Sequence, residues 1–184
     1  MNEGMKLLEG KNVNLRIMEK EDLSLFAEWV NKPEVFGEYN PLHQMPRTQA
    51  EKTLENPHEE TPFLILKKDG SKIGFVSYFY VLHVVGKQLE IGYSLLPGER
   101  GKGYGTEAIE IMVDYLFLSR DIQRIQVQTD PRNIASQRLL AKAGFSKEGT
   151  LRKNFFMRGE WRDVYIYSIL REEWKEPRII AKTN

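Results

Sequence analysis

Hydrophobic and polar positions repeat along the chain with two different periods. Alternation with a period of two residues, typical of strands, runs through seven segments: 13–17, 63–66, 73–82, 88–96, 124–129, 150–157 and 161–170. Helical spacing of apolar residues marks four segments, at about 23–30, 48–56, 106–116 and 134–143. The resulting order, β-α-α-β-β-β-α-β-α-β-β, predicts an α/β (α+β) protein with a mixed sheet and helices on both faces. Parallel pairing is expected around the strand-helix-strand unit of residues 88–129.

Turn and loop residues divide these elements. Asp69-Gly70 predicts a hairpin, Gly144 a left-handed helix cap, and residues 158–160 a tight turn between the last two strands. Thr48 and Glu51 form a capping box that predicts the start of the second helix. Residues 33–47 are irregular and are interpreted as a loop or lid rather than core. Residues beyond 170 are interpreted as a polar tail.

Length and composition favour one domain over residues 1–184, with a core at about 8–170 and a tail at 171–184. The chain has 27 basic and 26 acidic residues, a net charge of +1, so no global field favours nucleic acid or a membrane surface. Because cysteine is absent, a thiolate metal site and a cysteine nucleophile are excluded. We expect no signal peptide and no bilayer-spanning segment, and therefore a cytoplasmic location.

The segment Glu99-Arg-Gly-Lys-Gly-Tyr-Gly-Thr106 is a glycine-rich turn between a predicted strand and a predicted helix. Glycines allow a tight turn and close approach of a ligand, and the free N–H groups of a helix start attract anions. The spacing does not fit a nucleotide P-loop, because no lysine follows Gly103. It fits the dinucleotide fingerprint poorly, because the glycines fall at 101, 103 and 105. The turn therefore predicts a local anion site of another kind.

Three segments in order resemble the GNAT superfamily of N-acetyltransferases. Arg100-Gly-Lys-Gly-Tyr-Gly105 resembles its acetyl-CoA motif, and residues 133–145 resemble its Asn-x-x-Ser…Lys-x-Gly-Phe run. Residues 89–93, together with 158–164, are similar to the Rim-type branch, whose members resemble ribosomal-protein N-terminal acetyltransferases. The resemblance covers roughly residues 8–170. It implies a GNAT fold with a central mixed, mostly antiparallel twisted sheet of about seven strands, splayed between strands 4 and 5.

The resemblance also implies which residues bind acetyl-CoA as co-substrate. Backbone N–H groups of the glycine turn would hold the pyrophosphate, and the splayed strand and Asn133 would contact the pantetheine arm. The cofactor-binding residues expected in this way are Ser94, Leu95, Leu96, Arg100, Gly101, Lys102, Gly103, Tyr104, Gly105, Thr106, Asn133 and Ser136. No metal is expected, because His43, His58 and His83 are scattered without ligand spacing.

Glu90 and Ser136 are the candidate catalytic residues. An amine acceptor is mostly protonated at pH 7, so a base is useful, and Glu90 lies on the strand that leads to the acetyl site. A surface or ion-pairing role for Glu90 remains an alternative. Leu140 occupies the position where many superfamily members have a tyrosine acid, and the resemblance therefore favours Ser136 as the proton donor. A helix-capping role for Ser136 remains its alternative.

The acceptor is expected to be a small-molecule amine or a protein N-terminus, acetylated by direct attack in a ternary complex. Phe36, Tyr39 and Glu90 are the candidate substrate-binding residues, because loops carry specificity. A noncatalytic acyl-CoA-binding sensor is the alternative function, indicated by the missing tyrosine. The chain is expected to act as a monomer or homodimer.

Overall fold

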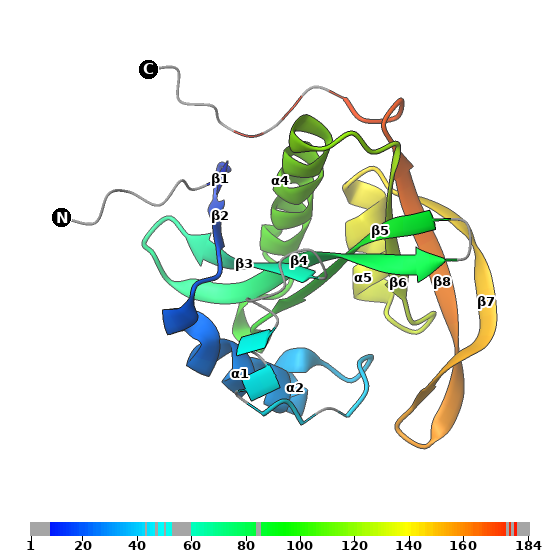
Figure 1. The fold of residues 1–184 in the computed structure, drawn as a ribbon, viewed down its shortest axis with the longest axis horizontal. Coiled ribbons are helices and arrows are strands. Elements are labelled where there is room, and N and C mark those ends of the chain that lie inside the picture. The colour runs from blue at the N-terminus through cyan, green and yellow to red at the C-terminus, as the bar shows by residue number, and fades with distance from the viewer. Residues whose placement is uncertain are drawn as a thin grey trace.

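An eight-stranded sheet forms the centre of the protein in the computed structural model, which describes residues 8–42, 44–46, 48–49, 51–52, 60–83, 86–175, 177 and 179 (Figure 1). Its strands are β1 (Leu8–Glu9), β2 (Val13–Ile17), β3 (Glu60–Lys67), β4 (Lys72–His83), β5 (Gly86–Leu95), β6 (Arg124–Thr129), β7 (Ser146–Met157) and β8 (Glu160–Leu170). The strand order is β1-β2-β3-β4-β5-β6-β8-β7. The seven predicted strands are confirmed, and the two-residue β1 is the eighth.

The sheet is mixed and mostly antiparallel, as predicted. β5 and β6 are parallel, whereas the other neighbouring strands pair antiparallel. In the described part of the chain the register between β5 and β6 consists of one pair, Glu90 with Gln126, although β5 continues to Leu95. The splay between these strands stays a prediction, to which this short pairing lends support.

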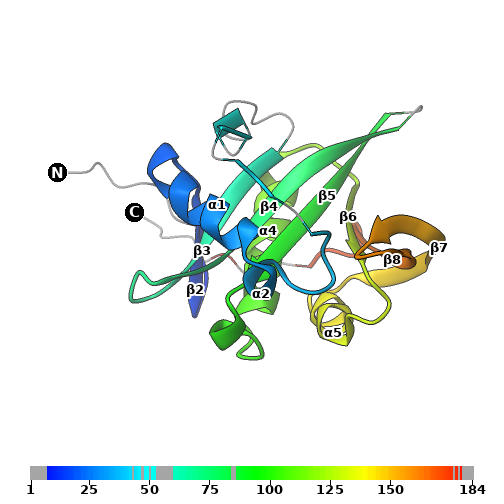
Figure 2. The same ribbon diagram turned by 90° about the horizontal axis from the view of Figure 1, so that it is seen from below.

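Helices cover both faces of the sheet, and each face has its own hydrophobic cluster. Helices α1 (Leu23–Asn31) and α2 (Pro33–Phe36) lie below the strands in Figure 1 and in front of them in Figure 2. Helices α4 (Tyr104–Ser119) and α5 (Ile134–Lys142) lie on the opposite face. Alternation along β3 divides its side chains: Leu64 packs with α1, whereas Phe63 joins the cluster around α4.

The interpretation of residues 33–47 as a loop outside the core is wrong at its start. Residues 33–36 form α2, and Val35 is 7% exposed within the cluster of α1. Pro33 stands at the first helical turn, where its missing N–H has no cost. Of the predicted helix 48–56, residues 48, 49, 51 and 52 are helical, and its other residues lie outside the described ones. His43 and His58 also lie outside them.

The chain after β8 is more than a polar tail. Trp174 packs against Phe117 of α4, with ring centroids 5.4 Å apart. Its indole N–H donates to the buried Asp114 at 2.8 Å, and the backbone N–H of Ile179 donates to the same carboxylate at 3.0 Å. Trp174 and Ile179 therefore pack against the core on the α4 face. None of the described helices is long and apolar enough to cross a membrane.

Candidate functional site

The glycine turn connects β5 to α4 through a short 3-10 helix, Pro97–Glu99. Gly101 and Gly103 have φ angles of 75° and 88°, in the left-handed region that favours glycine. No described atom lies within 4 Å of where a Cβ would be at either glycine, so the turn is open on its outer side. Backbone conformation, and not lack of space, therefore requires glycine at these two positions.

The start of α4 presents unpaired backbone donors at this turn. The N–H of Glu107 donates to Gly103 O at 3.2 Å, as the first bond of the helix. The four preceding N–H groups, those of residues 103–106, therefore lack an intrahelical acceptor, as at any helix start. Gly103 and Thr106 also line a cavity of about 420 Å³ that extends to Asn12 and Lys142. Donors of this kind suit a phosphate group.

The two basic side chains of the turn are held by the protein itself. Arg100 donates to Leu95 O at 2.9 Å and to Val35 O at 2.8 Å, so its guanidinium connects β5 to α2. Lys102 pairs with Glu99 at 3.0 Å. We infer that Arg100 stabilises the turn, and its predicted contact with a phosphate stays a prediction.

The end of β5, residues 94–96, is fixed by its neighbours on both sides. The Ser94 hydroxyl donates to Val35 O at 2.8 Å, and the Leu96 N–H donates to Ile73 O at 2.9 Å. Gly74 of β4 is required here, because a Cβ would lie 2.2 Å from Ser94 O. The Ser94 side chain is therefore engaged with α2, and both backbone groups of Leu96 are paired, because its carbonyl accepts the Glu99 N–H at 2.9 Å. The role of Ser94 and Leu96 in binding pantetheine stays a prediction.

Asn133 and Ser136 lie together at the start of α5. The Asn133 side chain accepts the Ser136 N–H at 3.0 Å, so Asn133, and not Ser136, caps the helix. The Ser136 hydroxyl lies 2.7 Å from the hydroxyl of Tyr93 on β5. Burial raises the pKa of Tyr93 to about 12. Leu140 is fully buried in the core.

Sequence analysis did not identify Tyr93 as a site residue, although the alternation along β5 indicates which face of the sheet it lies on. Along β5 it shares the face of Leu89 and Ile91, which the alternation directs toward the α4 and α5 side. The position of α5 over that face is a tertiary feature, so the pattern alone did not bring Tyr93 to Ser136.

Glu90 points to the opposite face of the sheet and is 4% exposed. Its carboxylate accepts the side-chain amide of Gln126 at 2.8 Å and that of Gln128 at 2.9 Å. A surface role for Glu90 is therefore wrong. Its carboxylate is buried, and the two amide donors compensate for the water that it has lost. Gln126 and Gln128 were missed, although their alternation with Ile125 and Val127 places them on the face of Glu90.

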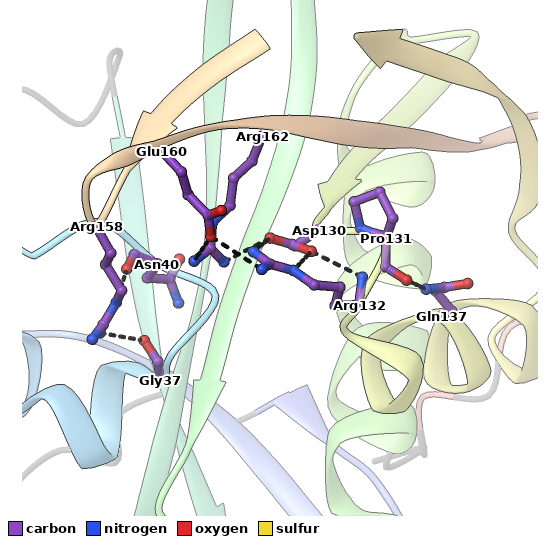
Figure 3. A network of polar contacts seen from close by, with 9 residues as sticks. All are labelled: Gly37, Asn40, Asp130, Pro131, Arg132, Gln137, Arg158, Glu160 and Arg162. Carbon is purple, nitrogen blue, oxygen red and sulfur yellow. Dashed lines mark hydrogen bonds and ion pairs between the residues drawn. The ribbon is translucent and has the colours of Figure 1, made fainter. Parts of the chain in front are cut away.

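A network of polar contacts joins three loops on the Glu90 face (Figure 3). Arg158, in the β7–β8 turn, donates to the carbonyls of Gly37 and Asn40, both at 3.2 Å. The buried Asp130, after β6, pairs with Arg132 at 2.9 Å and with Arg162 of β8 at 3.1 Å. Both arginines also pair with Glu160 of the β7–β8 hairpin. This network fixes the 37–40 loop beside the hairpin.

The candidate acceptor residues Phe36 and Tyr39 flank this loop. Phe36 ends α2 and packs against the α1 cluster. Burial, a hydrogen bond with Glu38 and the charge of Asp130 all raise the pKa of Tyr39. Tyr39 therefore lies near the polar network, whereas Phe36 lies partly in the core. Their contact with an acceptor stays a prediction.

The arrangement fits a phosphate-bearing carrier. The open turn at Gly101 and Gly103 and the helix start at Tyr104 provide anion donors, and the short β5–β6 pairing leaves backbone of β5 for a flexible arm. Among the described residues, no cluster of three or more His, Asp or Glu side chains is placed to hold a metal ion. Fold and site together define a transferase that takes its group from such a carrier.

Comparison with known proteins gives the family. A family model for the acetyltransferase (GNAT) domain matches residues 12–146. A probable N-acetyltransferase, YjcK of Bacillus subtilis, is 34% identical over 178 residues, which cover 91% of this chain and 98% of the relative. The chain therefore belongs to the GNAT family of N-acetyltransferases, in its Rim-like branch.

Solved structures share the fold at lower identity. The ribosomal-protein-S5-alanine acetyltransferase of Vibrio fischeri superposes with a TM-score of 0.78 at 24% identity, covering 93% of this chain and all of that one. The spermidine N-acetyltransferase of Vibrio cholerae, in complex with CoA and spermine, has a TM-score of 0.75 at 23% identity and covers 88% of this chain and 97% of that one. These two likenesses show the fold alone.

Proposed function

We propose that this protein transfers an acetyl group from acetyl-CoA to a primary amine by direct attack in a ternary complex. One observation carries the proposal: Glu90, which forms the one β5–β6 pair among the described residues, and Ser136, which contacts Tyr93 three residues further along, lie on opposite faces of β5. A base on one side and an acid on the other suit a reaction in which donor and acceptor meet at the gap beyond that pair. The glycine turn provides the donors for the pyrophosphate.

Each residue has a defined task in this scheme. Bound acetyl-CoA supplies the thioester carbonyl that the amine attacks. Glu90 takes a proton from the amine, whose unperturbed pKa of about 8 or 10 leaves it mostly protonated at pH 7. Ser136 gives a proton to the departing sulfur, and the amides of Gln126 and Gln128 hold Glu90 in place.

The side chains beside Glu90 favour an acceptor that carries a second positive charge. Glu60, Phe79 and Glu90 are successive partners across β3, β4 and β5, so they share one face of the sheet. Two carboxylates two strands apart are separated by about 10 Å, with an aromatic ring between them. Burial raises the pKa of Glu60, which a bound cation would reverse. A diamine or polyamine fits this row, and a spermidine N(1)-acetyltransferase of Escherichia coli is among the relatives, 27% identical over 174 residues.

Release of the CoA thiol tests the proposal. Purified protein and acetyl-CoA are mixed with matched acceptors: spermidine, a linear diamine, a monoamine of equal length, and a peptide with a free N-terminal alanine. Turnover with any primary amine supports the enzyme, and higher kcat/KM for the diamines than for the monoamine supports the cationic acceptor.

Two results contradict parts of this scheme. Turnover of the peptide without turnover of the small amines would contradict the cationic acceptor and assign the acceptor to a protein N-terminus. Thermal stabilisation by acetyl-CoA with silence across the whole panel would favour the noncatalytic sensor.

A further inference from the structure

The hydroxyls of Tyr93 and Ser136 meet where the start of α5 packs over β5. Tyr93 reaches from β5 toward the first turn of α5, and its hydroxyl oxygen lies 2.7 Å from Ser136 Oγ. Ser136 is 9% exposed, and its backbone is fixed because its N–H donates to the Asn133 cap. The O–H group of Ser136 can still rotate about its C–O bond.

The direction of the serine proton decides whether it reaches the sulfur. Only one hydroxyl proton can lie between the two oxygens, so one hydroxyl donates and the other accepts. Burial keeps the phenol of Tyr93 protonated at physiological pH, since its pKa is raised to about 12. If the phenol donates, the serine proton must point away from Tyr93. Leu140, in the core, offers no competing hydroxyl.

We propose that Tyr93 is a positioning residue whose O–H donates to Ser136 Oγ and directs the serine proton toward the departing sulfur. This inference rests on the proposed function. The amine attacks as neutral RNH₂, after its ammonium proton has passed through Glu90 to water. As the N–C bond forms and the C–S bond breaks, Glu90 takes the second proton that the nitrogen loses, and sulfur takes the proton of Ser136. The Tyr93 proton moves to Ser136 along their hydrogen bond, water reprotonates Tyr93, and Glu90 returns its proton to water.

A double-mutant cycle tests this role. Tyr93→Phe keeps the ring and removes the hydroxyl, and Ser136→Ala removes the proton donor. We expect Tyr93→Phe to lower kcat roughly tenfold, the effect of one net hydrogen bond, with KM for both substrates nearly unchanged. In the double variant kcat should equal that of Ser136→Ala, because Tyr93 acts only through the serine. Tyr167→Phe removes another buried hydroxyl of the same core and should leave kcat unchanged.

Several outcomes overturn the inference while acetyl transfer stands. An unchanged kcat in Tyr93→Phe would show that the serine donates to the tyrosine or that the pair is structural. An equal loss with and without Ser136 would show an independent role, and full turnover by Ser136→Ala would remove the group that Tyr93 is said to position. Melting temperatures of each variant separate lost folding from lost turnover. A wild-type protein that is silent with every acceptor would instead refute the proposed function, and this inference with it.

Discussion

Replacement of Glu90 by glutamine removes the proposed base and changes little else in shape. In the native protein the carboxylate accepts amide N–H groups of Gln126 at 2.8 Å and of Gln128 at 2.9 and 3.2 Å. A glutamine at position 90 keeps one carbonyl oxygen for these donors and turns its own NH₂ toward the other amide. The variant therefore loses both the base and part of a buried hydrogen-bond network.

The two losses differ enough in size to be separated. Hydrogen bonds to a charged group are worth about 1.5–3 kcal/mol and neutral ones about 0.5–1.5 kcal/mol, so we expect the free energy of unfolding to fall by about 1–3 kcal/mol. A domain of ordinary stability remains folded after such a loss. Loss of a general base lowers turnover by about 10²–10⁴-fold, which is about 3–5 kcal/mol in the barrier.

The assay compares kcat for CoA release at saturating acetyl-CoA and acceptor, with urea unfolding of the same samples. Asp22→Asn is the matched control, because Asp22 is a buried carboxylate that accepts hydrogen bonds from Arg16 and Lys72 and has no contact with the glutamines that hold Glu90. We expect both variants to lose stability and only Glu90→Gln to lose turnover. Turnover of Glu90→Gln within a factor of two of wild type near neutral pH would remove Glu90 from the mechanism, whatever its stability.

Three further perturbations follow from the contacts described above. A hydrogen bond from Arg124, and after it one from Ser168, lower the pKa of Glu148 to about 2, so its stabilisation is present above pH 4.5 and is lost as pH falls toward 2. Urea unfolding at several pH values should show this slope reduced in Glu148→Gln; an unchanged slope would contradict it. Gly74→Ala places a Cβ 2.2 Å from Ser94 O and should lower the free energy of unfolding by about 1–3 kcal/mol or more. It should also weaken the rise in melting temperature caused by acetyl-CoA. Gly92→Ala is the control, because a Cβ at position 92 meets only ordinary contacts. Asn133→Ala removes the cap of α5 and should cost about 1 kcal/mol in thermal unfolding, which Asn133→Asp should restore if the cap is the cause.

The order of elements and the glycine turn could be predicted because their signals are local. Alternation in β5 and β6 predicted the strands. Glycine is required at position 103 because the backbone there has a positive φ angle, which depends only on the local turn. The same alternation places Glu90 on the face opposite Leu89 and Ile91, as the structure has it. These predictions needed only sterics and the burial of apolar surface on one side of an element.

Other features depended on which elements meet, and local patterns carry no information on that. Val35 is core because α1 and the sheet enclose it, and Trp174 packs against the core because the chain folds back on α4. Neither contact could be predicted, because a single apolar residue in an irregular or polar segment gives no sequence signal of whether another element covers it.

The sequence by itself therefore determined the succession of strands and helices, the glycine turn before α4 and the family to which the chain belongs. Only the tertiary structure decided that Arg100 donates to carbonyls of β5 and α2, that two glutamines hold Glu90, and that Tyr93 meets Ser136. The physical reason is that backbone conformation and amphipathic periodicity are properties of neighbours in the chain. A hydrogen bond between residues 43 positions apart depends instead on how α5 packs over the sheet.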